Sequence, residues 1–324
     1  MKRLLVCSLA ALLTLTGITA AGAAAFPEKP ITIVVSSVAG GGVDVSTRFI
    51  ASAGEKYLGV PVVIENKPGG SSLTGSAEVA KAKPDGYTLI SQTCAVYTVA
   101  PHIYKTPYDP MKAFIPILKT GNPCMIMSAG PKAPAKTFEE FVAYAKANPG
   151  KVTVGCAGLG DISGIQCARA FKAMGIQVRI VPFGGAAETC SNLLGGHIMY
   201  GNISDGVALP HFESGKLIPF FEFGGKPSKY LKDMPTLDSL GYPGASTPYY
   251  RAIMAPAGTP REVVDVLRTA FLKMAEDPDV MKLFDNIKAS HTDFSNDPEA
   301  IQKQVEEEYA MFGDVVKELG ISKK

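Results

Sequence analysis

The sequence predicts an α/β fold with two lobes that face one cleft. Apolar, β-branched runs alternate with helix-like segments along the chain, a pattern typical of sheets covered by helices. A unit of strand, glycine-rich loop and helix occurs twice, at residues 31–50 and 152–173. The chain has 324 residues with 46% hydrophobic content, which is enough for two packed domains. In such folds, ligands bind at the carboxyl ends of the strands.

The first 25 residues have the features of a cleaved secretory signal peptide. Lys2 and Arg3 precede a mostly apolar stretch, and a run of alanines ends it just before Phe26. An uncleaved membrane anchor is the alternative, although the stretch is short and rich in small residues. Removal of residues 1–25 takes away two basic and no acidic residues and leaves a neutral chain. With no basic cluster, the chain is not expected to bind nucleic acid.

The first part of the chain begins with a buried strand at residues 31–35. A helix follows at residues 46–59, with Gly59 at its C-terminus. A second strand, a glycine-rich loop that leads into a helix, and a third strand come next, at residues 61–66, 68–83 and 84–92.

The later part of the chain continues the alternation. Residues 136–150 form a predicted helix with Thr137 as N-cap and a Pro-Gly stop, and residues 151–175 repeat the opening unit. Further strands are expected at residues 178–183 and 216–224, and helices at 184–196, 259–277 and 297–320. This alternation implies mostly parallel sheets.

The cysteines and histidines do not form a metal motif. After residue 25 the cysteines form no C-x-x-C pair, and no histidine is interleaved with them at the spacing of a zinc motif. The four histidines are scattered, so no metal site is expected. In an oxidising compartment one disulfide is plausible, and Cys167–Cys190 is the pairing we predict, because both lie near the starts of successive helices. The alternative is that all five are buried thiols.

The loop after the first strand, Gly40-Gly41-Gly42, suggests anion binding at a helix N-terminus. A nucleotide P-loop is excluded because the loop has no lysine. A dinucleotide fingerprint is disfavoured because its third glycine position holds Val45, although Glu65 stands where a ribose-binding acid would. Capture of a small carboxylate is the favoured interpretation. A purely structural turn remains the alternative.

An ordered set of motifs then identifies a family. "FPEKPITIVV", "GGGVD", "VVIENKPGGSSLTGSAEVAKAKPDGYTL", "YKTPYDPMKAFIPI", "VPFGGAAETCSNLLGGHI" and "MAPAGTP" occur in this order. From Phe26 onward the chain resembles the Bug/TctC family, the extracytoplasmic solute receptors of tripartite tricarboxylate transporters. The resemblance implies a two-lobed, type II-like periplasmic binding protein, a monomer that captures a small carboxylate and delivers it to the membrane permease subunits. It implies no catalysis and no cofactor.

The resemblance also implies which residues bind the ligand. The carboxylate-binding loop corresponds to Ser36, Ser37, Val38, Ala39, Gly40, Gly41, Gly42, Val43 and Asp44, with Ser36 and Ala39 in place of the usual prolines. Further contacts correspond to Gln92 and Thr93, to Gly158, Leu159, Asp161, Ser163 and Ile165, and to Asn202, Ile203 and Ser204. Ile165 and Ile203 replace the family's usual histidine and aspartate.

Tyr250 and Arg251 precede the "APAGTP" turn and are expected to reach the cleft if their strand lines it. For the tyrosine, core packing is an equal alternative, and for the arginine a surface or interlobe salt bridge is favoured slightly. The two isoleucines suggest a carboxylate with an apolar or aromatic body. A dicarboxylate is expected only if Arg251 faces the cleft and pairs with the second carboxylate.

The resemblance implies two crossings between the lobes. Residues 26–121 with 223–324 are expected to form lobe one, and residues 122–222 lobe two. Two other functions remain open: a secreted α/β enzyme acting on a small organic acid, and a periplasmic partner of a sensor kinase.

Overall fold

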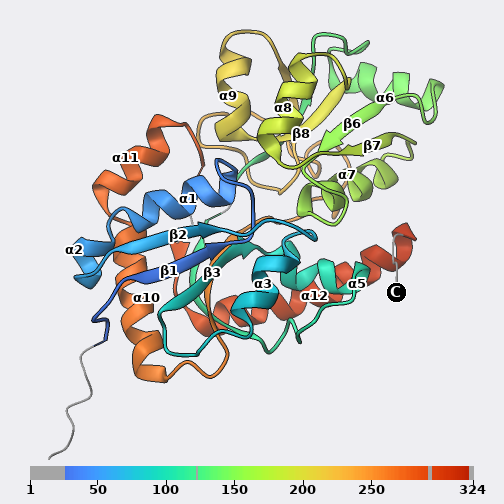
Figure 1. The fold of residues 1–324 in the computed structure, drawn as a ribbon. Coiled ribbons are helices and arrows are strands. Elements are labelled where there is room, and N and C mark those ends of the chain that lie inside the picture. The colour runs from blue at the N-terminus through green and yellow to red at the C-terminus, as the bar shows by residue number, and fades with distance from the viewer. Residues whose placement is uncertain (1–25, 122, 291–293, 321–324) are drawn as a thin grey trace, which may run out of the picture.

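The fold is described from a computed structural model, in which residues 26–121, 123–290 and 294–320 are placed (Figure 1). The predicted signal peptide, residues 1–25, lies outside the described residues. Over the described ranges, no helix combines the length and the apolar character that crossing a bilayer requires.

Two mixed sheets organise the chain, and the lobe built on each is named here lobe one and lobe two. In lobe one the strand order is β11-β4-β10-β3-β1-β2. In lobe two it is β7-β6-β8-β5-β9. The strands of lobe one are β1 (Ile31–Val35), β2 (Val62–Asn66), β3 (Thr88–Thr93), β4 (Phe114–Thr120), β10 (Arg251–Pro256) and β11 (Phe294–Ser295). Those of lobe two are β5 (Met125–Ala129), β6 (Thr153–Cys156), β7 (Arg179–Pro182), β8 (Tyr200–Ser204) and β9 (Ile218–Glu222).

Each sheet is parallel on one side and antiparallel on the other. β1 pairs in parallel with β2 and β3, and β6 pairs in parallel with β7 and β8. β10 is antiparallel to β3 and β4, and β5 is antiparallel to β8 and β9. The expectation of mostly parallel sheets is therefore wrong: three of the five strand pairings in lobe one and two of the four in lobe two are antiparallel. The reason is topological, since β4 leads directly into β5 and the chain re-enters lobe one at β10, without crossover helices at either point.

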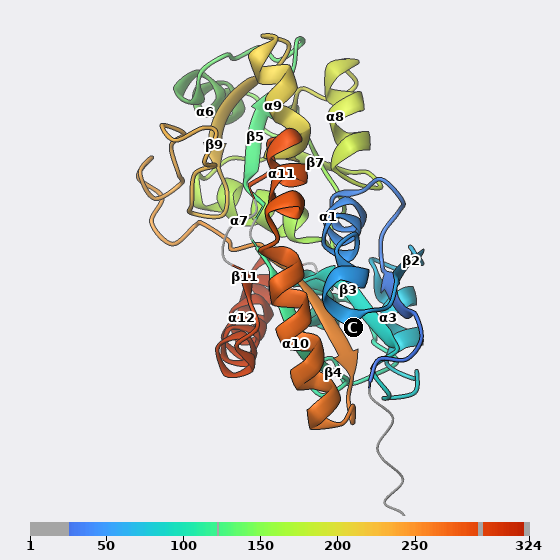
Figure 2. The same ribbon diagram turned by 90° about the vertical axis from the view of Figure 1, so that its left-hand side faces the viewer.

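Helices cover both faces of each sheet (Figures 1 and 2). The predicted helix at residues 46–59 is two helices, α1 (Gly42–Ala51) and α2 (Gly54–Leu58), and α1 starts earlier than expected. Gly59 caps α2 in the left-handed region, as predicted. The other helices of lobe one are α3 (Leu73–Val79), α4 (Ala95–Thr98), α5 (Ala100–Ile103), α10 (Arg261–Ala275), α11 (Pro278–Asn286) and α12 (Pro298–Leu319).

The helices of lobe two follow the sequence closely where a cap could be recognised. Thr137 caps its helix through a capping box with Glu140, as its position predicted. The helices are α6 (Phe138–Ala147), α7 (Ile162–Ala173), α8 (Ala186–Leu194) and α9 (Asp205–Glu213).

The chain passes between the sheets twice, between β4 and β5 and between β9 and β10. One apolar cluster includes residues of both lobes, among them Val34 of β1, Phe141 of α6 and Phe312 of α12. α12 runs beneath lobe one toward α7 of lobe two, where Lys172 forms a 3.3 Å ion pair with Glu318 (Figure 1). The lobes are thus joined on one side and open toward the cleft on the other.

The predicted disulfide does not form. Cys167 and Cys190 are both free, buried thiols, as are the three other cysteines of the described chain. Cys167 on α7 packs in the large cluster shared by both lobes, whereas Cys190 on α8 packs in a separate cluster with Leu193 and Ile198. A disulfide requires a short Cβ–Cβ distance, and packing in different apolar clusters agrees with the free state of the two thiols.

Candidate ligand-binding site

A cavity of about 380 Å³ lies between the lobes, at the carboxyl ends of β1, β3, β6 and β8. Its walls come from segments that are far apart in sequence, because each parallel strand delivers its following loop to the same edge. The lining residues are Ser36, Ser37, Val38, Gly41, Gly42, Val43, Pro68, Gly69, Ser71, Ser72, Thr93, Ala95, Val96, Met125, Ala157, Gly158, Gly160, Asp161, Phe183, Gly184, Gly185, Ala186, Ser204, Tyr249 and Arg251.

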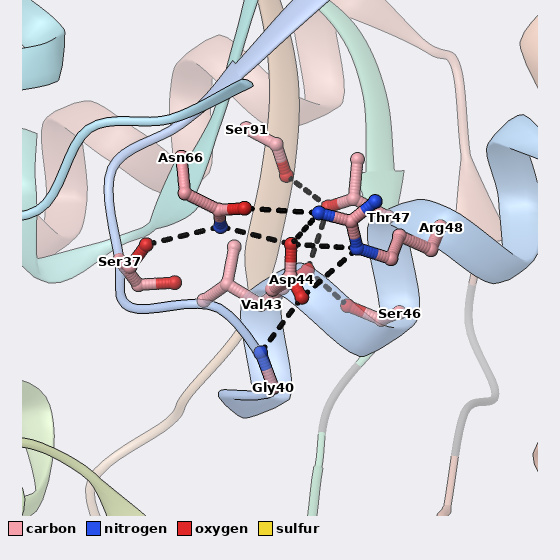
Figure 3. Close-up of polar contacts among 9 residues, drawn as sticks. All are labelled: Ser37, Gly40, Val43, Asp44, Ser46, Thr47, Arg48, Asn66 and Ser91. Carbon is pink, nitrogen blue, oxygen red and sulfur yellow. Dashed lines mark hydrogen bonds and ion pairs between the residues drawn. The ribbon is translucent and has the colours of Figure 1, made fainter. Parts of the chain in front are cut away.

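The loop between β1 and α1 is fixed by a buried carboxylate (Figure 3). Asp44 accepts hydrogen bonds from the backbone N–H of Gly40 at 2.8 Å and from the Asn66 amide at 2.8 Å. It also forms a 3.0 Å ion pair with Arg48. Burial raises the pKa of the Asp44 carboxyl, but these hydrogen bonds outweigh burial and hold the pKa below its usual value. Asp44 therefore holds the loop in its conformation and does not contact a ligand, because protein donors already bind its oxygens.

The amino end of α1 meets the cavity without a side-chain cap. Gly41 is the N-cap residue, it carries no capping side chain, and Gly41, Gly42 and Val43 all line the cavity. The first N–H groups of a helix have no partner within the helix, and the helix dipole makes this end positive. The end of α1 is therefore suited to an anion.

Arg251 supplies a formal positive charge at the same corner. Its side chain is 4% exposed and lines the cavity, and its Nη1 donates to Ser46 Oγ at 3.3 Å. The guanidinium also lies over the ring of Tyr249, 5.6 Å from the ring centroid. Within the described part of the chain it forms no ion pair, which rules out the salt bridge considered from the sequence.

In lobe two the amino end of α7 also lies at the cavity, but the carboxylate of Asp161 already caps it. Asp161 is the N-cap residue, and its Oδ1 accepts from the Ser163 N–H at 3.0 Å and from the Ser163 hydroxyl at 2.9 Å. Burial raises the pKa of this carboxyl, while the Ser163 bonds and the charge of Arg251 act in the opposite direction. The duplicated unit therefore does not give two equivalent anion sites.

The amino end of α8 also faces the cavity, and no side chain of its N-cap residue occupies it. Gly184, Gly185 and Ala186 line the wall, and the N-cap residue Gly185 has no capping side chain. These residues belong to the "VPFGGAAE" motif, which sequence reasoning used for the family resemblance but not for the site. A glycine pair directly after a strand and before a helix was the signal that could have identified it.

The comparisons with known proteins identify the family of this chain and agree with its fold. Residues 46–321 match the family model described as the tripartite tricarboxylate transporter family receptor, TctC. The chain belongs to the TctC family. It is a solute-binding receptor of that type, and the family assignment lends no support to a secreted enzyme or a sensor partner.

Relatives of this family share both sequence and fold. A Cupriavidus necator protein, "UPF0065 protein in gbd 5'region", is 32% identical and covers 92% of this chain and 90% of its own length. The periplasmic binding protein BugD, whose structure is known, is 29% identical in sequence. Its fold matches with a TM-score of 0.83, and the match covers 92% of this chain and 100% of the BugD chain. The structure of R. palustris Rpa4515 with adipate is 27% identical, with a TM-score of 0.84 over 92% of this chain and 99% of its own.

The structure brings together about half of the residues that the TctC resemblance singled out. Those that line the cavity are Ser36, Ser37, Val38, Gly41, Gly42, Val43, Thr93, Gly158, Asp161, Ser204 and Arg251. Those outside its lining are Ala39, Gly40, Asp44, Gln92, Leu159, Ser163, Ile165, Asn202, Ile203 and Tyr250.

Several residues outside the lining are part of the protein's own packing. Ile165 and Ile203 are fully buried in two separate apolar clusters, so the two isoleucines do not give the cavity an apolar wall. Gln92 accepts from the Ser76 hydroxyl at 2.5 Å, and the amide of Asn202 donates to Gln166 Oε1 at 3.0 Å. These polar groups stabilise the walls from behind.

The chain direction around Arg251 explains why Tyr249 lines the cavity although the sequence indicated Tyr250. Neighbouring residues of an extended chain point to opposite sides, so Tyr249 and Arg251 both line the cavity and Tyr250 points into the core. Tyr250 is fully buried, and core packing is the alternative that holds for it.

Proposed function

We propose that this TctC receptor works in the periplasm and binds a small carboxylate, which it delivers to the permease subunits of a tripartite tricarboxylate transporter. One observation carries the proposal: uncapped helix amino ends from both lobes, those of α1 and α8, face one cavity beside a buried arginine. This arrangement favours an anion over a cation or a neutral solute. A relative of the same fold was solved with adipate, which agrees with such a ligand.

The two lobes provide the means of capture. We take residues 26–121 with 223–324 as lobe one and residues 122–222 as lobe two, hinged at the two crossings. A ligand held by amides from both lobes stabilises the closed arrangement, because only that arrangement makes all the contacts. We propose binding by a monomer, without catalysis.

The ligand class differs from the one first expected. The apolar-body interpretation depended on Ile165 and Ile203, which lie in the core. The condition set for a dicarboxylate, that Arg251 faces the cleft, fits the position of the guanidinium in the cavity lining. We therefore expect dicarboxylates to bind at least as well as aromatic acids.

A thermal-shift screen followed by calorimetry tests this function. The probes are benzoate, citrate, glutamate and the unbranched dicarboxylates from succinate to adipate. An acid present at 100 times its dissociation constant stabilises the protein by about 2.7 kcal/mol. Stabilisation by neutral sugars or cationic amines, with no response to any acid, would contradict a carboxylate receptor.

A further inference from the structure

Arg251 carries a buried charge that forms no ion pair among the described residues, and its guanidinium lies over the ring of Tyr249. Arg251 is 4% exposed, and its one side-chain hydrogen bond within the described part of the chain is the 3.3 Å contact from Nη1 to Ser46 Oγ. The Nε atom is buried without a hydrogen-bond partner among the described residues. A guanidinium has five donors, so most of its capacity is unused.

The surroundings make this charge more costly. A Cβ atom at Gly42 would lie 2.6 Å from Arg251 Nη2, so the guanidinium lies against the first turn of α1. That is the positive end of the helix dipole, and a cation there is unfavourable. Of the nearby carboxylates, Asp44 is bound by Arg48, Asn66 and Gly40. Asp161 accepts from Ser163 through Oδ1 and acts on Arg251 through its charge, without a direct ion pair.

A buried charge that forms no direct ion pair is unfavourable, and the protein retains this one at the wall of its cavity. We propose that Arg251 is the specificity-determining residue of this site: its guanidinium forms a direct ion pair with a ligand carboxylate at the amino end of α1. The proposal rests on the proposed carboxylate function. It adds a charged side chain to a site otherwise built from backbone amides.

The position of Gly42 makes the ion pair testable without changing any charge. The residue has no positive φ and begins a helix, so alanine suits its backbone. The alanine methyl group would, however, occupy the space of Arg251 Nη2. Because Nη2 is the far end of a flexible side chain, the guanidinium moves while the helix stays.

The experiment is a double-mutant cycle on the full chain without residues 1–25. The variants are Arg251→Met, Gly42→Ala and the combination of both. Arg268→Met is the matched control, because Arg268 is a lobe-one arginine that binds the Pro116 carbonyl at 2.9 and 3.0 Å, outside the cavity. Calorimetry measures the dissociation constants for succinate, adipate and benzoate.

We expect Arg251→Met to weaken the tightest-binding acid by about 10- to 100-fold, the usual contribution of a charge-assisted hydrogen bond. Gly42→Ala should weaken binding of the same acid by a smaller factor when Arg251 is present. It should have no effect on binding when combined with Arg251→Met. Arg268→Met should bind as the wild type does. Without ligand, Arg251→Met should melt about 2 °C higher than the wild type, because a buried charge that forms no direct ion pair is gone.

Two results overturn the proposal on its own: unchanged affinity in Arg251→Met, or an unliganded melting temperature that falls together with affinity, which would indicate a structural role. If the wild type binds none of the three acids, the proposed function fails as well. The two failures are therefore distinguishable.

Discussion

The carboxylate of Asp44 and the backbone N–H of Gly40 form a 2.8 Å hydrogen bond that folds the loop back on the first turn of α1 (Figure 3). Asn66 ties the same carboxylate to β2 and also donates to the Ser37 carbonyl at 3.2 Å. The loop that faces the ligand cavity is therefore held from behind by a buried polar network. Such a network orders the backbone amides before the ligand arrives.

We predict that Asp44→Asn weakens both the fold and the binding of an acid. The neutral amide keeps the shape of the side chain but removes the negative charge that pairs with Arg48 and replaces one of the two acceptor oxygens with an N–H donor. We expect a loss of about 1–3 kcal/mol in unfolding free energy and about a tenfold loss of affinity. Urea unfolding and calorimetry measure the two effects. Asp265→Asn, at an exposed position on α10, is the control and should be neutral; full affinity in Asp44→Asn would show that the loop needs no such support.

A glycine lies at a tight contact between the two lobes. A Cβ atom at Gly160, in the loop before α7, would lie 2.8 Å from the ring of Tyr104 in lobe one. We predict that Gly160→Ala keeps the lobes apart and lowers the affinity for adipate by about tenfold. Small-angle scattering with saturating adipate should show compaction in the wild type and less in the variant. Adding Tyr104→Ala to Gly160→Ala should restore closure, because it removes the ring that the new methyl group meets. Compaction of the Gly160→Ala variant equal to that of the wild type would show that this contact does not limit closure.

The sequence predicted local features of the site well, because they depend on nearby residues. The apolar run of β1 followed by three glycines specified a turn into a helix whose amino end has no capping side chain, and Thr137 specified a helix start. Asp161 in "GDISG" is also a recognisable N-cap residue, so the occupied end of α7 could have been inferred.

The location of Arg251 could not be predicted, because it depends on strand order. β10 inserts between β3 and β4, and its register places Arg251 opposite Thr93, more than 150 residues earlier. The same limit explains Ile203. Strand β8 is buried on both faces, so alternation alone cannot tell a cavity-facing residue from a core residue.

The five thiols should behave as free but protected groups. Burial raises the pKa of Cys167 and raises that of Cys190 to about 11, which suppresses the reactive thiolate. We predict slow alkylation by N-ethylmaleimide in the native state. In denaturant without reductant, mass spectrometry should show five adducts on the chain without residues 1–25. Three adducts would instead support a disulfide.

A buried glutamate behind the cavity should make stability depend on pH. Glu308 on α12 is 5% exposed, and burial raises the pKa of its carboxyl to about 7, even though the Gln304 amide, the charge of Lys119 and Tyr250 oppose the shift. Its Oε2 has no hydrogen-bond partner among the described residues.

The direction of the pH effect follows from proton binding. Because the folded pKa of Glu308 lies above its ordinary value of 4.5, the native state binds more protons than the unfolded state between pH 4.5 and 7. The stabilisation from the neutral acid is present below pH 4.5 and is lost as the pH rises through 7, by about 3 kcal/mol at most. We predict that Glu308→Gln, which stays neutral, loses less stability than the wild type between pH 5 and pH 8.5. Urea unfolding at both pH values measures the change in unfolding free energy for each protein. Burial also raises the pKa of Glu222 to about 7, but Glu222 is present in both proteins, so its contribution cancels when the two changes are subtracted. Equal pH dependence in both proteins would mean that Glu308 ionises with an ordinary pKa.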